Sequence, residues 1–322
     1  MNYNDASIVI TPNGTKAGKL YAVKPTDGSG DLTVTRATSA TRVNASGVIE
    51  TVGANVPRLD YSNGTCPSIL VEPQRTNVLL NSETLATQSV TVTAQAYTLS
   101  FYGNGTVALS GTHTASVVGL GTTRKTYTFT PTAGTLTLTI TGACTKGQLE
   151  AGSYATSYIP TTTASVTRND DFLTRAGFGN TSASGTLFFD LYANNIFSTS
   201  GEYILQLFNG SIITDSFFST ANSLSIIANG TAIQIFNNGF TQNIQNITPT
   251  KGQRIKIAIR YNGTNISSAI NGTTSSVFTD TSVGVKNALR INNGQFSSHS
   301  FNSVVFIPDY LTDTQLAQLT TI

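Results

Sequence analysis

The chain has 322 residues, which is too long for one small hydrophobic core and fits two or three domains. Only 11% of the residues are charged and Trp is absent, while Thr, Ser, Asn and Gly replace the Lys and Glu that favour long helices, so the composition predicts an all-β protein. The formal net charge is +2 without a basic cluster, which excludes the electrostatic footprint of a nucleic-acid-binding protein.

The N-terminal residues lack the cationic start and long apolar core of a signal peptide, and no stretch approaches the roughly 20 apolar residues of a membrane span. We therefore expect neither a signal peptide nor membrane insertion. A composition typical of extracellular proteins without an export signal suits a virion protein, which assembles in the host cytoplasm and leaves by lysis. Cys66 and Cys144 are expected to be isolated small hydrophobic residues, unless the fold brings them together to pair.

Residues 1–83 form a turn-rich region that is expected to anchor the protein. A hairpin is predicted with its turn at residues 44–47, and the segment SILVEP predicts a short strand that ends at Pro73. Much of the remaining backbone needs hydrogen-bond partners from elsewhere. We therefore expect this region to dock on the other modules or on another subunit rather than to fold alone.

Residues 84–160 are predicted to form a small β-sandwich, because apolar residues alternate with polar ones in short runs. These apolar residues are Tyr97, Leu99 and Phe101, then Val107 and Leu109, then Tyr127 and Phe129, then Leu136, Leu138 and Ile140. The polar stretch 160–171 is expected to link this module to the next one.

Residues 161–322 are predicted to form a second β-sandwich. Short apolar runs that end in Gly or Asn-Gly recur there at spacings of roughly ten residues, as in a sandwich of antiparallel strands. The runs are GTLFFDLYA, YILQLFNG, SLSIIANG and TAIQIFNNG, and VVFIP predicts a late strand ended by Pro308.

The clearest local signal lies at residues 254–278. RIKIAIRY places four apolar residues on one face and three basic residues on the other, so it predicts a strand with one buried face. The pairs Asn262-Gly263 and Asn271-Gly272 are preferred in two-residue type I′ turns. Two such turns at this spacing predict a three-stranded antiparallel meander.

A short helix is predicted at the C-terminus. Thr312 and Gln315 match a T-x-x-Q capping box, in which each residue satisfies a backbone N–H of the first turn. Leu311 and Leu316 occupy the positions of a hydrophobic staple, and Leu319 extends the buried side. The sequence therefore predicts a closing helix laid on a sandwich.

Two segments resemble a module of bacteriophage virion proteins, especially those of phages with Bacteroidetes hosts. Residues 35–77, TRATSATRVNASGVIETVGANVPRLDYSNGTCPSILVEPQRTN, are similar to the module itself. Residues 147–171, GQLEAGSYATSYIPTTTASVTRNDD, are similar to the segment that closes a small carbohydrate-binding-module-like jelly roll in those proteins. The C-terminal half resembles concanavalin-like or laminin-G-like sandwiches through IKIAIRYNGTNISSAINGTTSSVF and the ending LTDTQLAQL. The resemblance implies a head-fibre, tail-fibre or other virion-surface protein, often a trimer.

The acidic residues do not match the pattern of a glycoside hydrolase, which needs two carboxylates facing one sugar. Glu202 is the one glutamate in residues 161–322, and no acidic residue lies within ten positions of it. Asp170 and Asp171 are adjacent, so on a strand they would point to opposite faces, and we interpret them as a solvated pair in the linker. A long-range pair of Asp190 with Asp215 stays open as the alternative.

The histidines do not indicate a catalytic or metal site either. His113 and His299 lie in different predicted domains and in polar contexts, so both are expected to be exposed loop residues. Neither belongs to a zinc-spacing motif. We therefore expect a protein without enzymatic activity, without a cofactor and without a bound metal.

Calcium is an open alternative, because sandwiches of the resembling kind often bind it through oxygen ligands. Residues with suitable oxygens near predicted turns are Asp190, Asp215, Asp280, Asn209 and Asn229. They show no clustered Asp-x-Asp pattern, and Asp and Asn commonly occur in turns for the turn geometry itself.

Glycan binding would require an aromatic residue to stack on a sugar ring, and without Trp that residue must be Tyr. Tyr102 and Tyr192 are weak candidates, because each is out of phase with its core-facing neighbours. An outward Tyr that covers a neighbouring subunit is the competing interpretation.

The leading hypothesis is a phage fibre or surface-decoration protein, assembled as a homotrimer, that contacts other virion proteins of the capsid or tail and a host-surface glycan. A purely architectural capsid or tail component, a bacterial surface adhesin and an enzyme are the alternatives, in that order.

Overall fold

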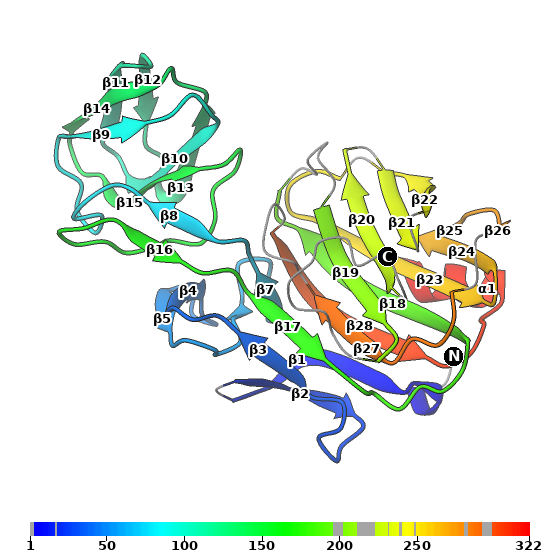
Figure 1. The fold of residues 1–322 in the computed structure, drawn as a ribbon. Coiled ribbons are helices and arrows are strands. Elements are labelled where there is room, and N and C mark those ends of the chain that lie inside the picture. Colours follow the sequence, from blue (N-terminus) through cyan, green and yellow to red (C-terminus); the bar gives the residue numbers. More distant parts are fainter. Residues whose placement is uncertain are drawn as a thin grey trace. The chain divides into compact units, whose positions relative to one another are not determined.

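The computed structural model describes residues 3–16, 18–195, 202–210, 223–230, 232–237, 240–247, 249–279, 283–291 and 298–322. The described chain is all-β, with large antiparallel sheets and one short α-helix near the C-terminus (Figure 1). It divides into two compact units. Unit 1 consists of Met1–Ala37, Arg42–Pro73 and Asp170–Ile322, and unit 2 consists of Thr38–Thr41 and Gln74–Asn169.

One sheet of unit 1, which we call the helix-side sheet, is arranged around a long C-terminal strand. Its strands are β1 (Ile8–Lys16), β7 (Ser68–Val71), β18 (Ser184–Ala193), β23 (Gln253–Asn262), β24 (Asn265–Ile270), β25 (Thr273–Thr274), β26 (Phe278–Thr279) and β28 (His299–Ile307). One edge of β28 pairs with β18, and the sheet continues through β23 to β24. The other edge of β28 pairs with β1 and β7, and the short strand β6 (Leu59–Asp60) extends β7.

We call the second sheet of unit 1 the opposite sheet. In order of pairing its strands are β3 (Leu32–Thr35), β17 (Phe172–Arg175), β27 (Ala288–Ile291), β19 (Glu202–Phe208), β20 (Ser223–Asn229), β21 (Ala232–Asn237) and β22 (Phe240–Asn246). Strand β2 (Lys19–Lys24) pairs with both β1 and β3 and so joins the two sheets. The N-terminal region therefore docks on the C-terminal sandwich, as the unpaired backbone of its sequence predicted.

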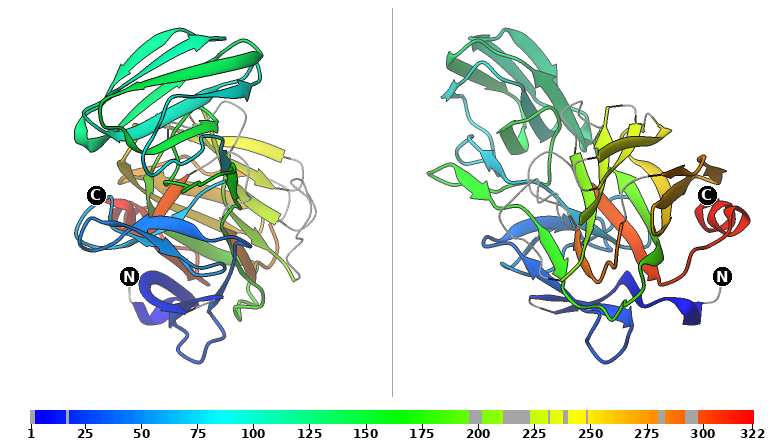
Figure 2. Two further views of the ribbon diagram at one scale, coloured as in Figure 1. Left: turned by 90° about the vertical axis from the view of Figure 1, so that its left-hand side faces the viewer. Right: turned by 45° about the vertical axis from the view of Figure 1, so that its right-hand side comes forward.

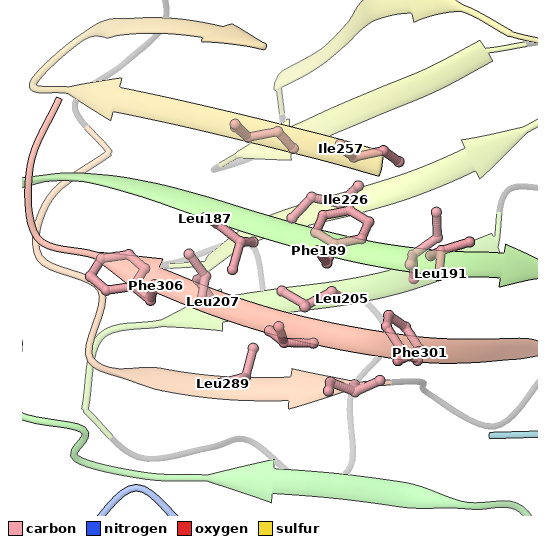
Figure 3. Close-up of a cluster of buried hydrophobic side chains, with 14 of the residues drawn as sticks. Leu187, Phe189, Leu191, Leu205, Leu207, Ile226, Ile257, Leu289, Phe301 and Phe306 are labelled. Atoms are coloured by element: carbon pink, nitrogen blue, oxygen red, sulfur yellow. The ribbon is translucent and has the colours of Figure 1, made fainter. Parts of the chain in front are cut away.

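The core of unit 1 lies between these two sheets. Every second residue of β18 contributes to it, and in Figure 3 Leu187 and Phe189 lie in one cluster with Leu205 and Ile226 of the opposite sheet. A register shift opposite Asp190 interrupts the alternation on β28, so that Phe301 and Val304 both reach this core although they are three positions apart. The alternation that the sequence predicts for a sandwich is therefore present on both sheets.

The meander predicted at residues 254–278 is confirmed, with one change in its first turn. The second turn is Asn271-Gly272 with φ of +48° and +84°, as a type I′ turn requires. In the first turn Asn262 pairs with Asn265, so the two loop residues are Gly263 and Thr264. Only Gly263 has a positive φ, of +57°, which is the φ pattern of a type II′ turn. The predicted type I′ turn at Asn262-Gly263 is therefore wrong by one residue, because the strand pairing extends through Asn262.

The C-terminal helix α1 (Asp313–Thr320) begins with the predicted capping box. Gln315 N donates to Thr312 Oγ1 at 3.3 Å, and Thr312 N donates to Gln315 Oε1 at 2.8 Å. Leu311 and Leu316 are both buried in one cluster, which confirms the predicted hydrophobic staple. The helix lies on the outer face of the helix-side sheet (Figure 2).

The outward face of β23 receives this helix through small and basic residues. Ala258 and Ala269 pair directly across β23 and β24, and both lie buried in the cluster that contains Leu316. Arg260 donates to the carbonyl of Leu311 and forms an ion pair with Asp313, while Lys256 Nζ donates to Thr321 O at 2.6 Å. The basic residues that the sequence placed outside the core thus bind both ends of the helix.

Unit 2 is a smaller two-sheet sandwich, as predicted from the middle of the chain. One sheet has the order β12 (Ala115–Val118), β11 (Thr106–Gly111), β14 (Gly134–Thr141) and β9 (Gln88–Val92), and the other has the order β13 (Gly121–Phe129), β10 (Tyr97–Gly103) and β15 (Thr145–Ala151). The predicted apolar residues Leu99, Phe101, Leu136 and Leu138 are buried between them. Cys144 joins this core, whereas Cys66 of unit 1 is exposed, and both are free thiols. The expectation of a small buried hydrophobe therefore holds for Cys144 alone.

The segment 160–171 is not a free linker. Val166–Arg168 form β16, which pairs with β8 (Arg75–Asn77) in unit 2. Asp171, the last residue of this segment, belongs to unit 1 and is buried. The segment thus connects the two units, as expected, but its polar residues belong to a paired strand and an ion-pair network rather than to a solvated linker.

The chain passes between the units after residues 37, 41, 73 and 169. The hairpin predicted with its turn at residues 44–47 is present as β4 (Ala40–Val43) and β5 (Ile49–Val52), with Asn44 N bonded to Val48 O. The contacts group residues 1–37 and 42–73 with the C-terminal sandwich, whereas three consecutive segments, 1–83, 84–160 and 161–322, were expected. That the segments 1–83, 84–160 and 161–322 fold independently of one another stays a prediction.

Tyr3–Asp5 form a single 3-10 turn before β1. In the part of the chain that the structure describes, no helix has the length and apolar character needed to cross a membrane.

Candidate functional site

The two tyrosines proposed from the sequence belong to different units. Tyr102 lies near the end of β10, where it pairs with Thr145, and its side chain is half-buried. Tyr192 lies on β18 between Arg254 and Ser300 of the neighbouring strands and is also half-buried. They do not form one site, and each stays a candidate by itself.

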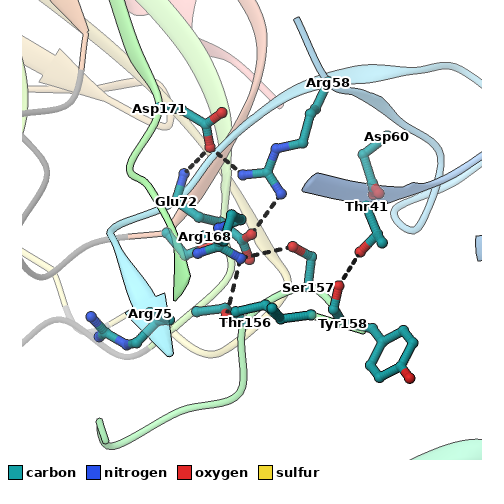
Figure 4. A network of polar contacts seen from close by, with 12 residues as sticks. Thr41, Arg58, Asp60, Glu72, Arg75, Thr156, Ser157, Tyr158, Arg168 and Asp171 are labelled. Atoms are coloured by element: carbon teal, nitrogen blue, oxygen red, sulfur yellow. Dashed lines mark hydrogen bonds and ion pairs between the residues drawn. The ribbon is translucent and has the colours of Figure 1, made fainter. Parts of the chain in front are cut away.

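Among the acidic residues, the burial of Asp171 differs most from what the sequence predicted. Its side chain is 2% exposed and forms ion pairs with Arg36 and Arg58 of the same unit. Figure 4 shows the contact with Arg58. The Arg36 contact measures 2.8 Å from Nη1 to Oδ1. The interpretation of Asp170 and Asp171 as a solvated pair is therefore wrong for Asp171, while Asp170 is half-buried.

Glu72 completes this network in unit 1. Arg58 Nη1 donates to Glu72 Oε2 at 2.7 Å, and the Glu72 N–H donates to Asp171 Oδ2 at 3.0 Å. Burial opposes the charge of Arg58, but Asp171 and Glu72 outweigh it and raise the pKa of the guanidinium above its ordinary value. Two arginines and two carboxylates thus compensate one another, which is the arrangement that makes buried charges tolerable.

The other acidic candidates are not placed as a catalytic pair. Asp190 lies within β18 rather than near a turn, and it accepts from Arg254 Nε at 2.9 Å and from Asn302 Nδ2 at 3.0 Å. Asp215 and Asp280 lie outside the described residues, as does the side chain of Glu202. The possible pairing of Asp190 with Asp215 therefore stays untested.

The two histidines differ from each other in environment. His113 lies in a loop, as expected, but it is half-buried rather than exposed, because its ring stacks on Phe129 at 4.5 Å. His299 begins β28, is 1% exposed and contacts the ring of Phe301 edge-on, so its expected exposure is wrong. Burial lowers the pKa of His299 to about 3, which keeps the ring neutral at physiological pH.

Among the calcium candidates, Asn209 is exposed and Asn229 is half-buried at the end of β20. Within the described residues, no three His, Cys, Asp or Glu side chains gather as metal ligands would. The described part of the chain thus offers no carboxylate cluster on which a metal site could be argued.

A cleft of about 250 Å³ on unit 2 brings polar and aromatic groups together. It is lined by Gln74, Arg75, Thr76, Val78, Tyr97 and Ala151. Tyr97 and Ala151 pair with each other at the ends of β10 and β15, so they form one wall. The short strand β8 supplies the opposite lining, and its Thr76 hydroxyl is fixed by Thr167 of β16 at 2.8 Å. The cleft therefore combines Tyr97, which is 6% exposed, with hydrogen-bonding groups on paired strands.

Arg75 is the charged residue of this cleft. Its side chain is 12% exposed, and its guanidinium lies over the ring of Tyr154 at 5.4 Å. Gly152 allows this position, because a Cβ there would lie 2.9 Å from Arg75 Nε. The Glu150 carboxylate lies 3.9 Å from Nε, which is an ion pair but not a hydrogen bond.

Glu150 has its own hydrogen-bond donors. The fully buried carboxylate accepts from Thr156 N at 2.8 Å, from Thr156 Oγ1 at 2.7 Å and from Gln148 Nε2 at 2.6 Å. Arg168 donates to Ser157 Oγ at 2.9 Å, as Figure 4 shows, and Arg124 donates to Thr156 O at 2.6 Å. Arg75, Arg124 and Arg168 therefore all contact the segment of residues 150–157, in which Glu150 is the one carboxylate.

Sequence reasoning did not identify the Arg75 cleft. Tyr97 was assigned to the core, where its ring does belong, and Arg75 was read only as part of the resemblance of residues 35–77. One signal was available: Gln74–Asn169 contains five basic and two acidic side chains, an excess of three positive charges in a protein whose net charge is +2. That count places the excess positive charge in residues 74–169. It does not reveal the cleft, because the lining residues come from strands far apart in sequence.

The chain matches no known protein-family model and no curated protein. It has weak structural similarity to the binding domain of botulinum neurotoxin DC in complex with rat synaptotagmin II, with 12% identity, a TM-score of 0.36 and coverage of 47% of this chain and 40% of that one. It is similar to the Ruminococcus gnavus IT-sialidase CBM40 bound to α2,3-sialyllactose, with 13% identity, a TM-score of 0.33 and coverage of 43% and 83%. It is also similar to a carbohydrate esterase from the Shiga toxin-encoding bacteriophage phi24B, with 13% identity, a TM-score of 0.32 and coverage of 42% and 74%. The chain thus spans less than half the length of the neurotoxin chain, and at these TM-scores the similarities carry no argument about function.

Proposed function

We propose that the protein is a non-enzymatic, glycan-binding component of a phage particle surface, and that unit 2 holds the sugar in the Arg75 cleft. The observation that carries this proposal is the cleft itself, which is lined by Arg75, Gln74 and Thr76 together with Tyr97. Sugars present a rim of hydroxyl groups, so a cleft lined by planar and hydroxyl-bearing polar side chains suits them.

The absence of catalysis is part of the proposal. The buried carboxylates Asp171, Glu72 and Asp190 are engaged by arginines, and Glu150 accepts three hydrogen bonds. A glycosidase acid or base must instead face a water molecule or a glycosidic oxygen. These engaged carboxylates favour a structural role over a catalytic one.

The virion location rests on the resemblance of residues 35–77 and 147–171 to phage virion modules. Both segments contribute to the buried framework, because Arg36, Arg58 and Glu72 come from the first and Asp171 from the second. We further propose a homotrimer on the particle surface that contacts other virion proteins and assembles in the host cytoplasm.

The first test is a glycan array probed with the full chain, alongside cryo-EM of particles that carry it. Binding of defined glycans, together with density that projects from the particle, is the expected result. Density sealed between other virion proteins, without glycan binding, would contradict the proposal and leave a purely architectural component.

A further inference from the structure

We infer that the Arg75 cleft selects anionic saccharides, with the terminal nitrogens of Arg75 bound to the carboxylate or sulfate of one acidic sugar. This inference rests on the proposed glycan-binding function and names its ligand class.

The hydrogen bonds of Arg75 are the first reason. A guanidinium has five N–H donors. Among the described residues one acceptor is present, the carbonyl of Gln74, which lies 2.9 Å from Nη1. Nε is buried and has no hydrogen-bond partner there. A mostly buried guanidinium with a single acceptor leaves its Nη groups available to a ligand that brings acceptors.

The second reason is that Arg75 is held in place before any ligand arrives. The Tyr154 ring lies under the guanidinium, and the backbone at Gly152 approaches it so closely that a Cβ would lie 3.1 Å from Nη2. The register of β8 with β16 fixes the start of the side chain, because Arg75 pairs with Arg168. A fixed planar fork loses little conformational entropy on binding and matches the geometry of a carboxylate.

The third reason is the balance of charge around the cleft. Glu150 is the nearest carboxylate, but it lies 3.9 Å from Arg75 and is already satisfied by Thr156 and Gln148. Arg124 contacts the same segment and adds a positive charge, and residues 74–169 carry five basic and two acidic side chains. An anion entering the cleft therefore meets a net positive charge of unit 2, whereas a neutral sugar gains nothing from it.

The size of the cleft limits the ligand. A volume of about 250 Å³ is below the roughly 300–1,000 Å³ of typical small-molecule pockets, so it fits one sugar residue rather than an oligosaccharide chain. Gln74 is exposed at the rim and Thr76 is half-buried beside it, and both can bond ring hydroxyls. The expected ligand is thus a terminal or single acidic sugar.

The test compares matched sugars on the full chain. Glucuronate-, galacturonate- and sialate-terminated oligosaccharides, their neutral counterparts and sulfated counterparts are titrated by calorimetry against the wild type and the variants Arg75→Gln, Arg75→Lys and Lys125→Gln. Lys125 is a half-buried basic residue of β13 that does not line the cleft, so its variant is the control for charge alone.

We expect acidic sugars to bind more tightly than their neutral counterparts, and Arg75→Gln to weaken acidic-sugar binding by about tenfold to a hundredfold. Arg75→Lys should recover part of this loss, and Lys125→Gln should change affinity less than about twofold. The carboxylated and sulfated arms distinguish which anion is bound, and a preference for either over the neutral sugar supports the inference.

Equal binding of neutral and acidic sugars, unaffected by Arg75→Gln, would overturn the inference while leaving glycan binding intact. Binding of no sugar in any arm would overturn the proposed function and the inference with it. Circular dichroism of each variant separates loss of the ligand from loss of the fold.

Discussion

At the residue scale, the burial of the charged side chains differs most from what the sequence pattern predicts. Asp171 follows a polar stretch, yet it is 2% exposed and bridges Arg36 and Arg58. Arg260 lies on the outward face of β23, yet it is buried beneath the C-terminal helix. In both cases the partner is more than 50 positions away in sequence, so no local window contains it.

Asp171→Asn should destabilise unit 1 by about 3–5 kcal/mol, because it leaves two buried guanidinium groups with one carboxylate between them. The measurement is urea-induced unfolding followed by a signal from unit 1. The control is Glu50→Gln, which breaks the half-exposed Arg42–Glu50 ion pair and should cost about 0–1 kcal/mol. Equal losses in the two variants would refute the role assigned to Asp171.

Lys286 gives a pH-dependent prediction. It is 1% exposed, its Nζ donates to the carbonyl of Val283, and burial lowers its pKa from 10.5 to about 8. Between pH 8 and 10.5 the unfolded chain therefore binds more protons at this residue than the folded chain, so its contribution to stability rises with pH in that window. Below pH 8 the burial of the charged Lys286 ammonium lowers the free energy of unfolding by its full amount.

Lys286→Met should remove that rise. We expect the variant to gain most over the wild type at pH 7 and the difference to shrink as the pH approaches 10. Chemical unfolding of both proteins across this range measures it. Parallel stability curves would show that Lys286 titrates at its ordinary pKa in the folded protein.

At the element scale, strand periodicity and turn residues determine most of what is observed. β23 alternates between the core residues Ile255, Ile257 and Ile259 and outward residues, as its sequence predicts. Periodicity did not predict that the helix α1 packs on the outward face of β23. Ala258 and Ala269 are small because α1 packs there, and Lys256 and Arg260 are basic because they bind the ends of that helix.

Gly263→Val should destabilise unit 1 by about 1–3 kcal/mol, because it places a β-branched residue at a φ of +57°. No other atom lies within 4 Å of the added Cβ, so the cost is conformational rather than steric crowding by neighbours. The control is Gly263→Asn, since Asn tolerates a positive φ and should cost much less. If thermal unfolding gives the same loss for both variants, the turn assignment is wrong.

At the scale of the whole molecule, unit 2 is mostly an insertion in unit 1. The chain leaves unit 1 after Pro73 and returns at Asp170, and the flanking residues bond to each other in both directions. Asp171 N donates to Glu72 O at 3.0 Å, and Glu72 N donates to Asp171 Oδ2 at 3.0 Å. The two ends of the insertion are therefore already joined within unit 1.

Replacing residues 74–169 by a short Gly-Ser linker should leave unit 1 folded, because its core and its Arg36–Asp171 and Arg58–Glu72 ion pairs come entirely from the remaining residues. A cooperative thermal transition with a β-type circular dichroism spectrum is the expected result. The matched variant carries Asp171→Asn in the shortened chain and should unfold far more easily. Failure of the shortened chain to fold would mean that unit 1 requires unit 2.

The amino-acid sequence was sufficient to predict the all-β class, most of the strands, the meander, the capping box of the C-terminal helix and the need of the first 80 residues for outside partners. These follow from periodicity, turn chemistry and caps, which act between residues close in the chain. The burial of Asp171, the position of His299 in a strand and the shared cleft of Arg75 and Tyr97 could be seen only in the folded protein. Each depends on pairing between strands distant in sequence, where a one-residue change of register alters which side chains meet.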